Sequence, residues 1–194
     1  LSRSLQRRSA KPSHSAGGWL LDGKKSGGAA LDLHIHDTDF LIHLLGRPRS
    51  VTSVGTDEKP GGITHIFTTY GYPGKAVVAE GGWNYPPKWG FQMAYQAVFE
   101  KGTLEYDSGT GTFFTAGNSP KKPYPIRQTG AGSSSAKTGN ISSLGGYFNE
   151  LAAFVDCLEK GRMPKVATPR QAAESLEVTL AEIESARTGR TVKL

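Results

Sequence analysis

The sequence predicts an α+β fold, a large and mainly antiparallel open β-sheet with helices packed on one face. Near the start lies an apolar segment of helix length between glycines, followed by several short β-rich segments that Gly and Pro separate. Two further helical patterns close the chain. A run of strands followed by a run of helices is typical of α+β domains. With 194 residues, the chain is long enough to bury a sizeable core as one domain.

The first 26 residues are expected to form an irregular, basic connector ahead of a domain over residues 27–194. They are rich in Ser and Gly, and Trp19-Leu20-Leu21 is their one apolar cluster. Six basic residues against one acidic residue leave +5 of the chain's formal charge of +6 in residues 1–25, from Arg3, Arg7, Arg8, Lys11, Lys24, Lys25 and Asp22. A basic terminal segment is usually solvated, so this charge does not indicate a nucleic-acid partner.

The segment Gly27–Gly46 predicts a helix of about 16 to 18 residues, too long for a typical strand. A glycine followed closely by proline ends it, which is a usual stop signal. At about 100° per residue, ionisable side chains fall on one narrow stripe of an otherwise apolar helix, at Asp32, His36, Asp39 and His43. Buried charges are costly unless they are paired or used, so this stripe is the strongest indication of function in the sequence.

A β region follows this helix. Its segments are rich in Val, Thr, Ile and aromatic residues, and the expected strands cover residues 49–56, 64–70, 76–83, 91–100, 103–107 and 112–115. The short connections among the last three indicate hairpins, and therefore antiparallel pairing. Tyr95 lies on one face of the 91–100 strand, together with Phe91, Met93, Ala97 and Phe99.

Two helices and a short strand close the chain. The expected elements are a helix over 147–160, a helix over 172–187 with Leu176, Leu180 and Ile183 on its apolar face, and a strand within 190–194. Thr168-Pro169 predicts the N-cap and first turn of the second helix. The stretch 128–146 is rich in Gly and Ser and is expected to be a flexible loop, with a lid or contact loop as the alternative. Cys157 is expected to be a buried or half-buried small residue.

Several classes of protein are not indicated. The chain has no apolar run of about 18 residues, so no membrane span is expected. No apolar region of a signal peptide follows the basic start, and a cytoplasmic location is expected. There is no Walker motif and no Gly-x-Gly-x-x-Gly between a strand and a helix, so no dinucleotide site is expected in this chain.

Two explanations of the ionisable stripe are open. Asp32 and His36 lie one helical turn apart, where a carboxylate can orient an imidazole or hold a substrate hydroxyl for proton transfer. Alternatively, these groups satisfy nearby backbone or each other. The text Asp-Leu-His-Ile-His also resembles the start of metal-dependent hydrolases. On a helix, however, His34 and His36 point about 200° apart and cannot chelate one metal, so no metal site is expected.

The same residues resemble the GGGxLxDxGxHxxD helix of Gfo/Idh/MocA oxidoreductases. The match runs from Ser26 to Asp32 and from His36 to Asp39, and ends at Leu44-Leu45-Gly46. The end of the chain is similar as well, with an aromatic-led helix, a Pro-Lys-Val segment and a last helix and strand, at 147–161, 164–166 and 172–194. The resemblance therefore covers roughly residues 17–194.

The resemblance implies an NAD(P)-dependent enzyme of two domains that acts on sugars or other polyols. An N-terminal Rossmann domain would bind NAD or NADP, and the C-terminal domain would supply substrate contacts and the sheet through which copies oligomerise. By this resemblance, His36 is the catalytic acid or base and Asp32 its hydroxyl-binding partner. Asp39 is a substrate contact, and Tyr95 is a candidate for the pocket wall.

This sequence departs from the family in three ways. His34 replaces a residue that is usually small. Glu58-Lys59-Pro60 copies a family motif that belongs in the Rossmann domain, and here it falls in an expected turn between strands, so no role is assigned to it. The Rossmann domain itself is not in the sequence, so the isolated chain is expected to be inactive. A non-catalytic dimerisation or sugar-binding module is the alternative from another class, followed by a metal-dependent hydrolase.

Overall fold

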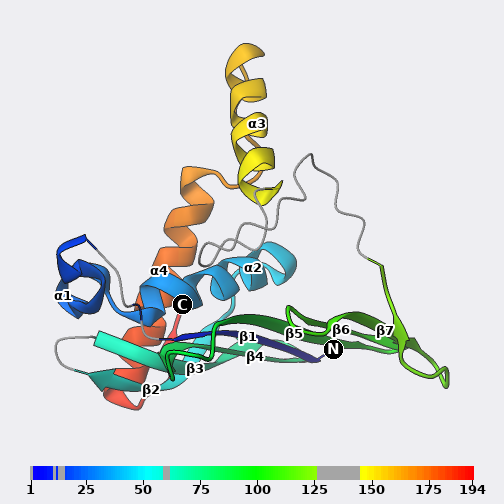
Figure 1. Cartoon of the computed structure of the whole chain (residues 1–194), viewed down its shortest axis with the longest axis horizontal. Coiled ribbons are helices and arrows are strands. Elements are labelled where there is room, and N and C mark those ends of the chain that lie inside the picture. The colour runs from blue at the N-terminus through cyan, green and yellow to red at the C-terminus, as the bar shows by residue number, and fades with distance from the viewer. Residues whose placement is uncertain (1, 11, 13–15, 59–61, 126–144) are drawn as a thin grey trace. The chain divides into compact units, whose positions relative to one another are not determined.

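The computed structural model describes residues 2–10, 12, 16–58, 62–125 and 145–194. The chain divides into two compact units, one of residues 1–124 with 173–194 and one of residues 125–172. Within its described residues, the first unit holds a nine-stranded sheet with helices on one face (Figure 1). The predicted α+β fold is confirmed.

The strands follow the order β8-β7-β6-β5-β1-β4-β3-β2-β9 across the sheet. Their bounds are β1 Ser2–Ala10, β2 Ser50–Glu58, β3 Gly62–Tyr72, β4 Lys75–Tyr85, β5 Phe91–Phe99, β6 Gly102–Asp107, β7 Gly111–Ala116, β8 Lys122–Pro123 and β9 Val192–Lys193. Among the described strands, every neighbouring pair is antiparallel except β1 with β4. The six strands predicted after the first helix are confirmed, and so is the terminal strand.

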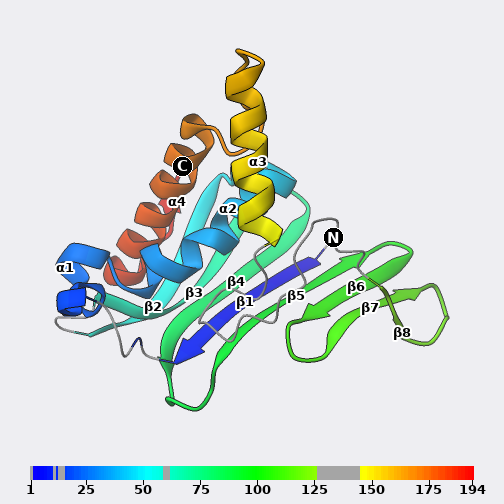
Figure 2. The same ribbon diagram turned by 45° about the horizontal axis from the view of Figure 1, so that its top comes forward.

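The prediction of irregular structure over residues 1–26 is wrong for Ser2–Ala10. This segment forms β1, which lies between β4 and β5 in the middle of the sheet (Figure 2). The polar sequence of this segment did not predict a strand. Its buried apolar residue is Leu5, and two of its arginines pair with acidic residues far along the chain. Arg7 pairs with Asp37, and Arg8 pairs with Glu80.

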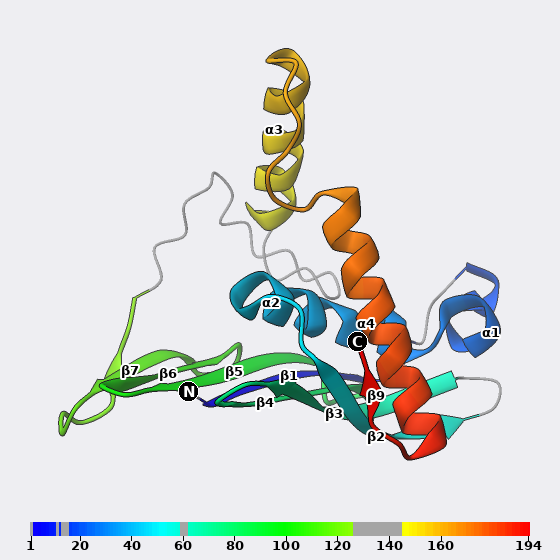
Figure 3. The same ribbon diagram turned by 180° about the vertical axis from the view of Figure 1, so that it is seen from behind.

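The described helices of the first unit cover one face of the sheet (Figures 1 and 3). They are the 3-10 helix η1 at Ala16–Leu21, α1 at Gly23–Ser26, the π-helical turn η2 at Ala30–His34, α2 at Ile35–Leu45, and α4 at Pro169–Thr188, which begins in the second unit. The predicted helix over Gly27–Gly46 is therefore confirmed, with a π-helical first turn that the sequence did not predict.

The main core lies where α2 and α4 meet the sheet. Its buried residues come from both ends of the chain and from the central strands, and include Leu5, Leu41, Val51, Tyr70, Val77 and Val178. Fully burying one such side chain stabilises the fold by roughly 1.5–3 kcal/mol. Because this core joins β1 to α4, the sheet and the last helix depend on each other.

The predicted apolar face of the last helix is wrong for Leu176 and Leu180, which are 42% and 50% exposed. Ile183 is buried as predicted. The buried face of α4 is instead largely polar, with Ser175, Val178, Thr179, Glu182 and Ser185. Buried polar groups are tolerated where they are hydrogen-bonded. Thr179 donates to the carbonyl of Ser175 within α4, whereas Ser175, Glu182 and Ser185 have partners on the first helix or the sheet. Those partners are too far along the chain for a periodicity argument to find.

In the second unit, α3 covers Gly145–Glu159, which confirms the predicted helix. Cys157 is half-buried, as expected. The Oγ1 of Thr168 accepts a hydrogen bond from the N–H of Gln171 at 3.3 Å, and the Gln171 side chain accepts one from the N–H of Thr168 at 2.9 Å. This reciprocal cap confirms the predicted helix start. No helix in the described ranges is long and apolar enough to cross a bilayer.

Two adjacent glycines of β4 make room for two histidines on opposite faces of the sheet. A Cβ atom at Gly81 would lie 2.7 Å from the Cβ and 3.1 Å from the Cα of His34. At Gly82 it would lie 2.6 Å from the ring of His65. The first clash involves atoms close to a helix backbone, whereas the second involves a ring at the far end of a side chain.

We expect Gly81→Ala to destabilise the chain by about 1–3 kcal/mol, since overpacking forces the helix away from the sheet. Gly82→Ala is the matched control on the neighbouring position, and should cost less because only the His65 side chain, and no helix backbone, has to shift. Urea denaturation of both variants measures the difference. An equal loss of unfolding free energy in the two variants would contradict the prediction that the packing at Gly81 is tighter than the packing at Gly82.

Candidate active site on the first helix

The helix with the predicted site residues begins as η2 and continues as α2. Gly27 and Gly28 lead into it with positive φ angles of 76° and 75°, which glycine adopts without strain. The N–H of Ile35 donates to the carbonyl of Ala30, five residues earlier, which is the bond that defines a π-helix. π-helical turns are rare and are found frequently at functional sites.

Asp32 and His36 lie on the less buried side of this helix. His36 reaches solvent and Asp32 is half-buried. Loss of hydration by packing lowers the pKa of His36, and the charge of Arg7 lowers it further, against the raising effect of the nearby carboxylates. Burial raises the pKa of Asp32, against a smaller lowering effect of His36. A ring that is neutral near pH 7 beside a carboxyl group is suited to accepting a proton from a hydroxyl.

Arg7 and Asp37 belong to the same surroundings, and sequence reasoning missed both. The Nε and Nη2 atoms of Arg7 donate to Oδ1 of Asp37 at 3.2 and 3.0 Å, and Nη1 lies 3.0 Å from the sulfur of Met93. Asp37 is 4% exposed, and burial raises its pKa although Arg7 opposes this. The pair fastens β1 to α2 directly beside His36. Because β1 was expected to be irregular, no pattern in the sequence could place Arg7 there.

Asp39 is exposed on α2, and its Oδ1 accepts a hydrogen bond from the Ser175 hydroxyl at 2.6 Å. One carboxylate oxygen is therefore tied to α4. The predicted role of Asp39 as a substrate contact depends on its other oxygen. His43, the last member of the predicted stripe, is exposed.

Tyr95 lies half-buried on β5, on the face of the sheet that the helices cover. Its ring is 6.3 Å from the ring of Phe40 on α2 and stacks on Tyr106 at 5.4 Å. Burial raises the pKa of Tyr95, with a further contribution from Tyr106. The hydroxyl therefore stays protonated and can donate a hydrogen bond at the edge of α2.

Tyr95 also borders a groove of about 390 Å³ over β1, β5, β6 and β7. Most of its polar lining, including Gln6, Gln96, Glu105 and Asp107, alternates with residues that face α2 and so belongs to the opposite face of the sheet. This groove is therefore not the place where His36 would act.

The two histidines of the His-x-His motif lie in different environments. His34 is fully buried with Nε2 2.8 Å from Oε2 of Glu182, whereas His36 is exposed. Within the ranges that the structure describes, no group of three or more His, Cys, Asp or Glu side chains could hold a metal ion. Two other predictions concern residues outside the described ranges. They are the turn at Lys59 and Pro60, to which no role was assigned, and nearly all of the loop over 128–146.

A family model described as "Oxidoreductase family, C-terminal alpha/beta domain" matches residues 3–194 of the sequence. The chain belongs to the Gfo/Idh/MocA oxidoreductase family. It corresponds to the C-terminal domain of that family, so the predicted resemblance is confirmed. A search of curated proteins found no match to this sequence.

Solved structures share this fold. An aldose-aldose oxidoreductase from Caulobacter crescentus complexed with glycerol aligns with a TM-score of 0.74 at 20% identity, over 100% of this chain and 55% of that one. Levoglucosan dehydrogenase with NADH and levoglucosan gives 0.75 at 14%, over 100% and 58%. An oxidoreductase from Agrobacterium radiobacter with NAD+, L-tartaric acid and magnesium gives 0.74 at 16%, over 99% and 56%. The chain thus spans little more than half the length of these proteins.

We expect Arg7→Met to raise the pKa of His36, because it removes a positive charge and leaves Asp37 unpaired nearby. Arg8→Met is the matched control, since Arg8 is the next residue and pairs with Glu80 instead. An NMR titration of the histidine ring protons measures both variants. An unchanged or lower pKa of His36 in Arg7→Met would contradict the assignment of Arg7 to this site.

Proposed function

We propose that this chain is the substrate-binding and catalytic part of an NAD(P)-dependent oxidoreductase that acts on a hydroxyl group of a sugar or polyol. One observation carries the proposal most directly. His36 is accessible, has a lowered pKa, and interacts electrostatically with Asp32 one turn away on a helix that is otherwise anchored in the fold. Membership of an oxidoreductase family supports it, and so do the ligands named for two structural neighbours, glycerol and levoglucosan.

His36 is the proposed proton acceptor. In the oxidising direction its neutral ring takes the proton of the substrate hydroxyl, and in the reducing direction the protonated ring returns it. Asp32 receives a hydrogen bond from that hydroxyl or a neighbouring one and favours the protonated ring. Asp39 and Tyr95 are proposed substrate contacts, one through its remaining carboxylate oxygen and the other through its phenolic hydroxyl.

The residues of this chain do not fit the main binding site of a dinucleotide. The sequence has no Gly-x-Gly-x-x-Gly turn between a strand and a helix, which is how a Rossmann domain holds the pyrophosphate. We therefore propose that NAD or NADP is held mainly by a separate cofactor domain, and that the isolated chain is inactive. The nicotinamide would accept or donate the hydride, while this chain binds and orients the substrate and moves the proton.

The open face of the sheet is the proposed surface for a second copy of the chain. Val54, Phe67 and Val78 are 63%, 50% and 41% exposed on it, and Val54 and Phe67 are direct partners in adjacent strands. Beside them the residue Glu80 is 7% exposed, since Arg8, His65 and Tyr85 all contact its carboxylate. An exposed apolar group of this kind, next to a satisfied polar cluster, is typical of an interaction surface.

We expect His36→Asn to lower the turnover of the enzyme that contains this chain by roughly 10²–10⁴-fold, because the variant cannot exchange a proton near neutral pH. The Michaelis constant for the cofactor should change little. Oxidation by the unaltered enzyme should also fall as the pH drops through the lowered pKa of His36, since the protonated ring accepts no proton.

His43→Asn is the matched control, an exposed histidine two turns further along the same helix, and it should retain full turnover. Steady-state kinetics with a panel of sugars and polyols against NAD+ and NADP+ provides the measurement. Turnover of His36→Asn equal to that of the control would overturn the catalytic assignment.

For the oligomer, we expect Phe67→Glu to shift the chain toward smaller species in sedimentation velocity, because a charge at the centre of an apolar contact is costly. Leu44→Glu is the control, since Leu44 is 42% exposed on α2 rather than on the open face. If both variants sediment like the unaltered chain, the open sheet face is not where copies associate.

A further inference from the structure

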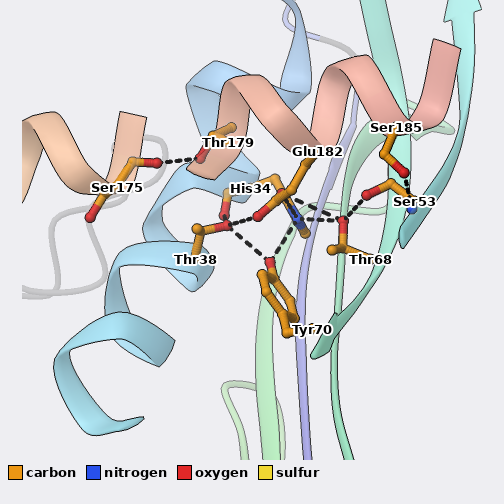
Figure 4. A network of polar contacts seen from close by, with 9 residues as sticks. All are labelled: His34, Thr38, Ser53, Thr68, Tyr70, Ser175, Thr179, Glu182 and Ser185. Carbon is orange, nitrogen blue, oxygen red and sulfur yellow. Dashed lines mark hydrogen bonds and ion pairs between the residues drawn. The ribbon is translucent and has the colours of Figure 1, made fainter. Parts of the chain in front are cut away.

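A buried pair that the proposed chemistry does not use joins the first helix to α4. His34 and Glu182 are both fully buried, and Nε2 of His34 lies 2.8 Å from Oε2 of Glu182. Figure 4 shows the two side chains meeting between η2, α4 and the sheet. Whichever atom carries the proton, the contact is a short hydrogen bond between fully buried groups, where such bonds are strong and their loss is costly.

Hydroxyl groups from three other positions complete this network. Thr38 donates to Oε1 of Glu182 at 3.0 Å and contacts the Tyr70 hydroxyl at 3.0 Å. The Tyr70 hydroxyl and the Thr68 hydroxyl lie 3.2 and 3.3 Å from Nε2 of His34. Burial, with a contribution from Glu182, holds the pKa of Tyr70 well above its usual value, so its hydroxyl keeps its proton. Hydroxyl groups of α2 and β3 therefore contact both members of the His34–Glu182 pair.

The network includes a residue of the π-helical turn itself. His34 is the last residue of η2, two residues from Asp32 and two from His36. Its Nδ1 has no hydrogen-bond partner in the described part of the chain, so the ring is hydrogen-bonded through Nε2. On the other side of the ring, Gly81 leaves no space for even one carbon atom. The ring is thus held between β4 and Glu182, and it can move only if the turn moves with it.

A π-turn places successive side chains differently from an α-turn, because its hydrogen bonds span five residues instead of four. Asp32 lies inside the π-turn, and His36 lies in the first turn of α2. The direction of the carboxyl group relative to the imidazole therefore depends on this turn keeping its form. A turn of this unusual kind persists only where its surroundings over-determine it.

We propose that His34 and Glu182 are positioning residues, which hold the π-turn so that Asp32 and His36 face the same substrate. This inference rests on the proposed roles of Asp32 and His36, but it concerns how they are placed rather than what they do. It also gives His34, the residue that departs from the family pattern, a function. Neither His34 nor Glu182 touches the substrate, since both are fully buried.

The test compares Glu182→Gln with Ser185→Ala in this chain. Glu182→Gln keeps the size of the side chain but replaces one carboxylate oxygen by an amide group that cannot accept. Ser185→Ala removes a buried hydroxyl from the same face of α4, where it contacts the N–H of Ser53 and the carbonyl of Arg190 and not the first helix. Tyr70→Phe, which removes one hydroxyl, serves if Glu182→Gln does not fold.

Two readouts report on placement rather than on stability. The first is hydrogen exchange of the Ile35 amide, whose bond to Ala30 defines the π-turn. The second is the NMR titration of His36, whose pKa depends on Arg7 of β1 and on Asp32, Asp37 and Asp39 of its own helix. In Glu182→Gln or Tyr70→Phe we expect the Ile35 amide to exchange faster than the loss of global stability alone accounts for. We also expect the pKa of His36 to rise toward its usual value. In Ser185→Ala both should follow global stability only.

In the enzyme that contains this chain, Glu182→Gln should also lower turnover by about 10- to 100-fold, the size of effect that misplaced catalytic groups produce, with little change in the Michaelis constant for the cofactor. Exchange and titration in Glu182→Gln and Tyr70→Phe that match Ser185→Ala would overturn the proposal. Because those readouts need no turnover, they remain decisive even if His36→Asn shows that His36 is not catalytic.

Discussion

The structure depends on the close contact between the first helix and β4. Because Gly81 has no side chain, the backbone at His34 can approach the strand, and only then does the ring reach Glu182. That contact brings α4 onto the same face of the sheet, where its polar side is buried against the Ser53 N–H of β2 and the Thr68 hydroxyl of β3. Hydrogen bonding in a dry interior therefore does here what an apolar helix face does elsewhere, and it fixes a single arrangement.

The sequence was informative wherever the signal was local. Glycine and proline marked the ends of the first helix, segments rich in Val, Thr, Ile and aromatic residues between turns marked β2 to β7, and Thr168 marked the start of α4. The stripe of Asp32, His36 and Asp39 was also visible, since a helical period of known size places these residues together. Local signals of this kind need no knowledge of what packs against them.

The features that sequence reasoning missed all depend on partners far along the chain. β1 carries arginines toward both faces, and no alternation of apolar residues reveals it, because the acids that pair with Arg7 and Arg8 come 30 and 72 residues later. Glu182 was assigned no role from the sequence, because its partner His34 lies on the first helix, far along the chain. Leu176 and Leu180 were assigned to the core for the same reason, since periodicity alone cannot tell which side of a helix finds hydrogen-bond partners.

The place of β1 has a consequence for how the chain can be assembled. β4 and β5 follow each other in the sequence with only residues 86–90 between them, yet they do not pair, because β1 lies between them. Without the first ten residues, the strands β2, β3, β4 and β9 would form one sheet and β5 to β8 another. β1 therefore pairs only with strands that are made much later than itself. The continuous sheet forms only after both β4 and β5 are available to pair with β1.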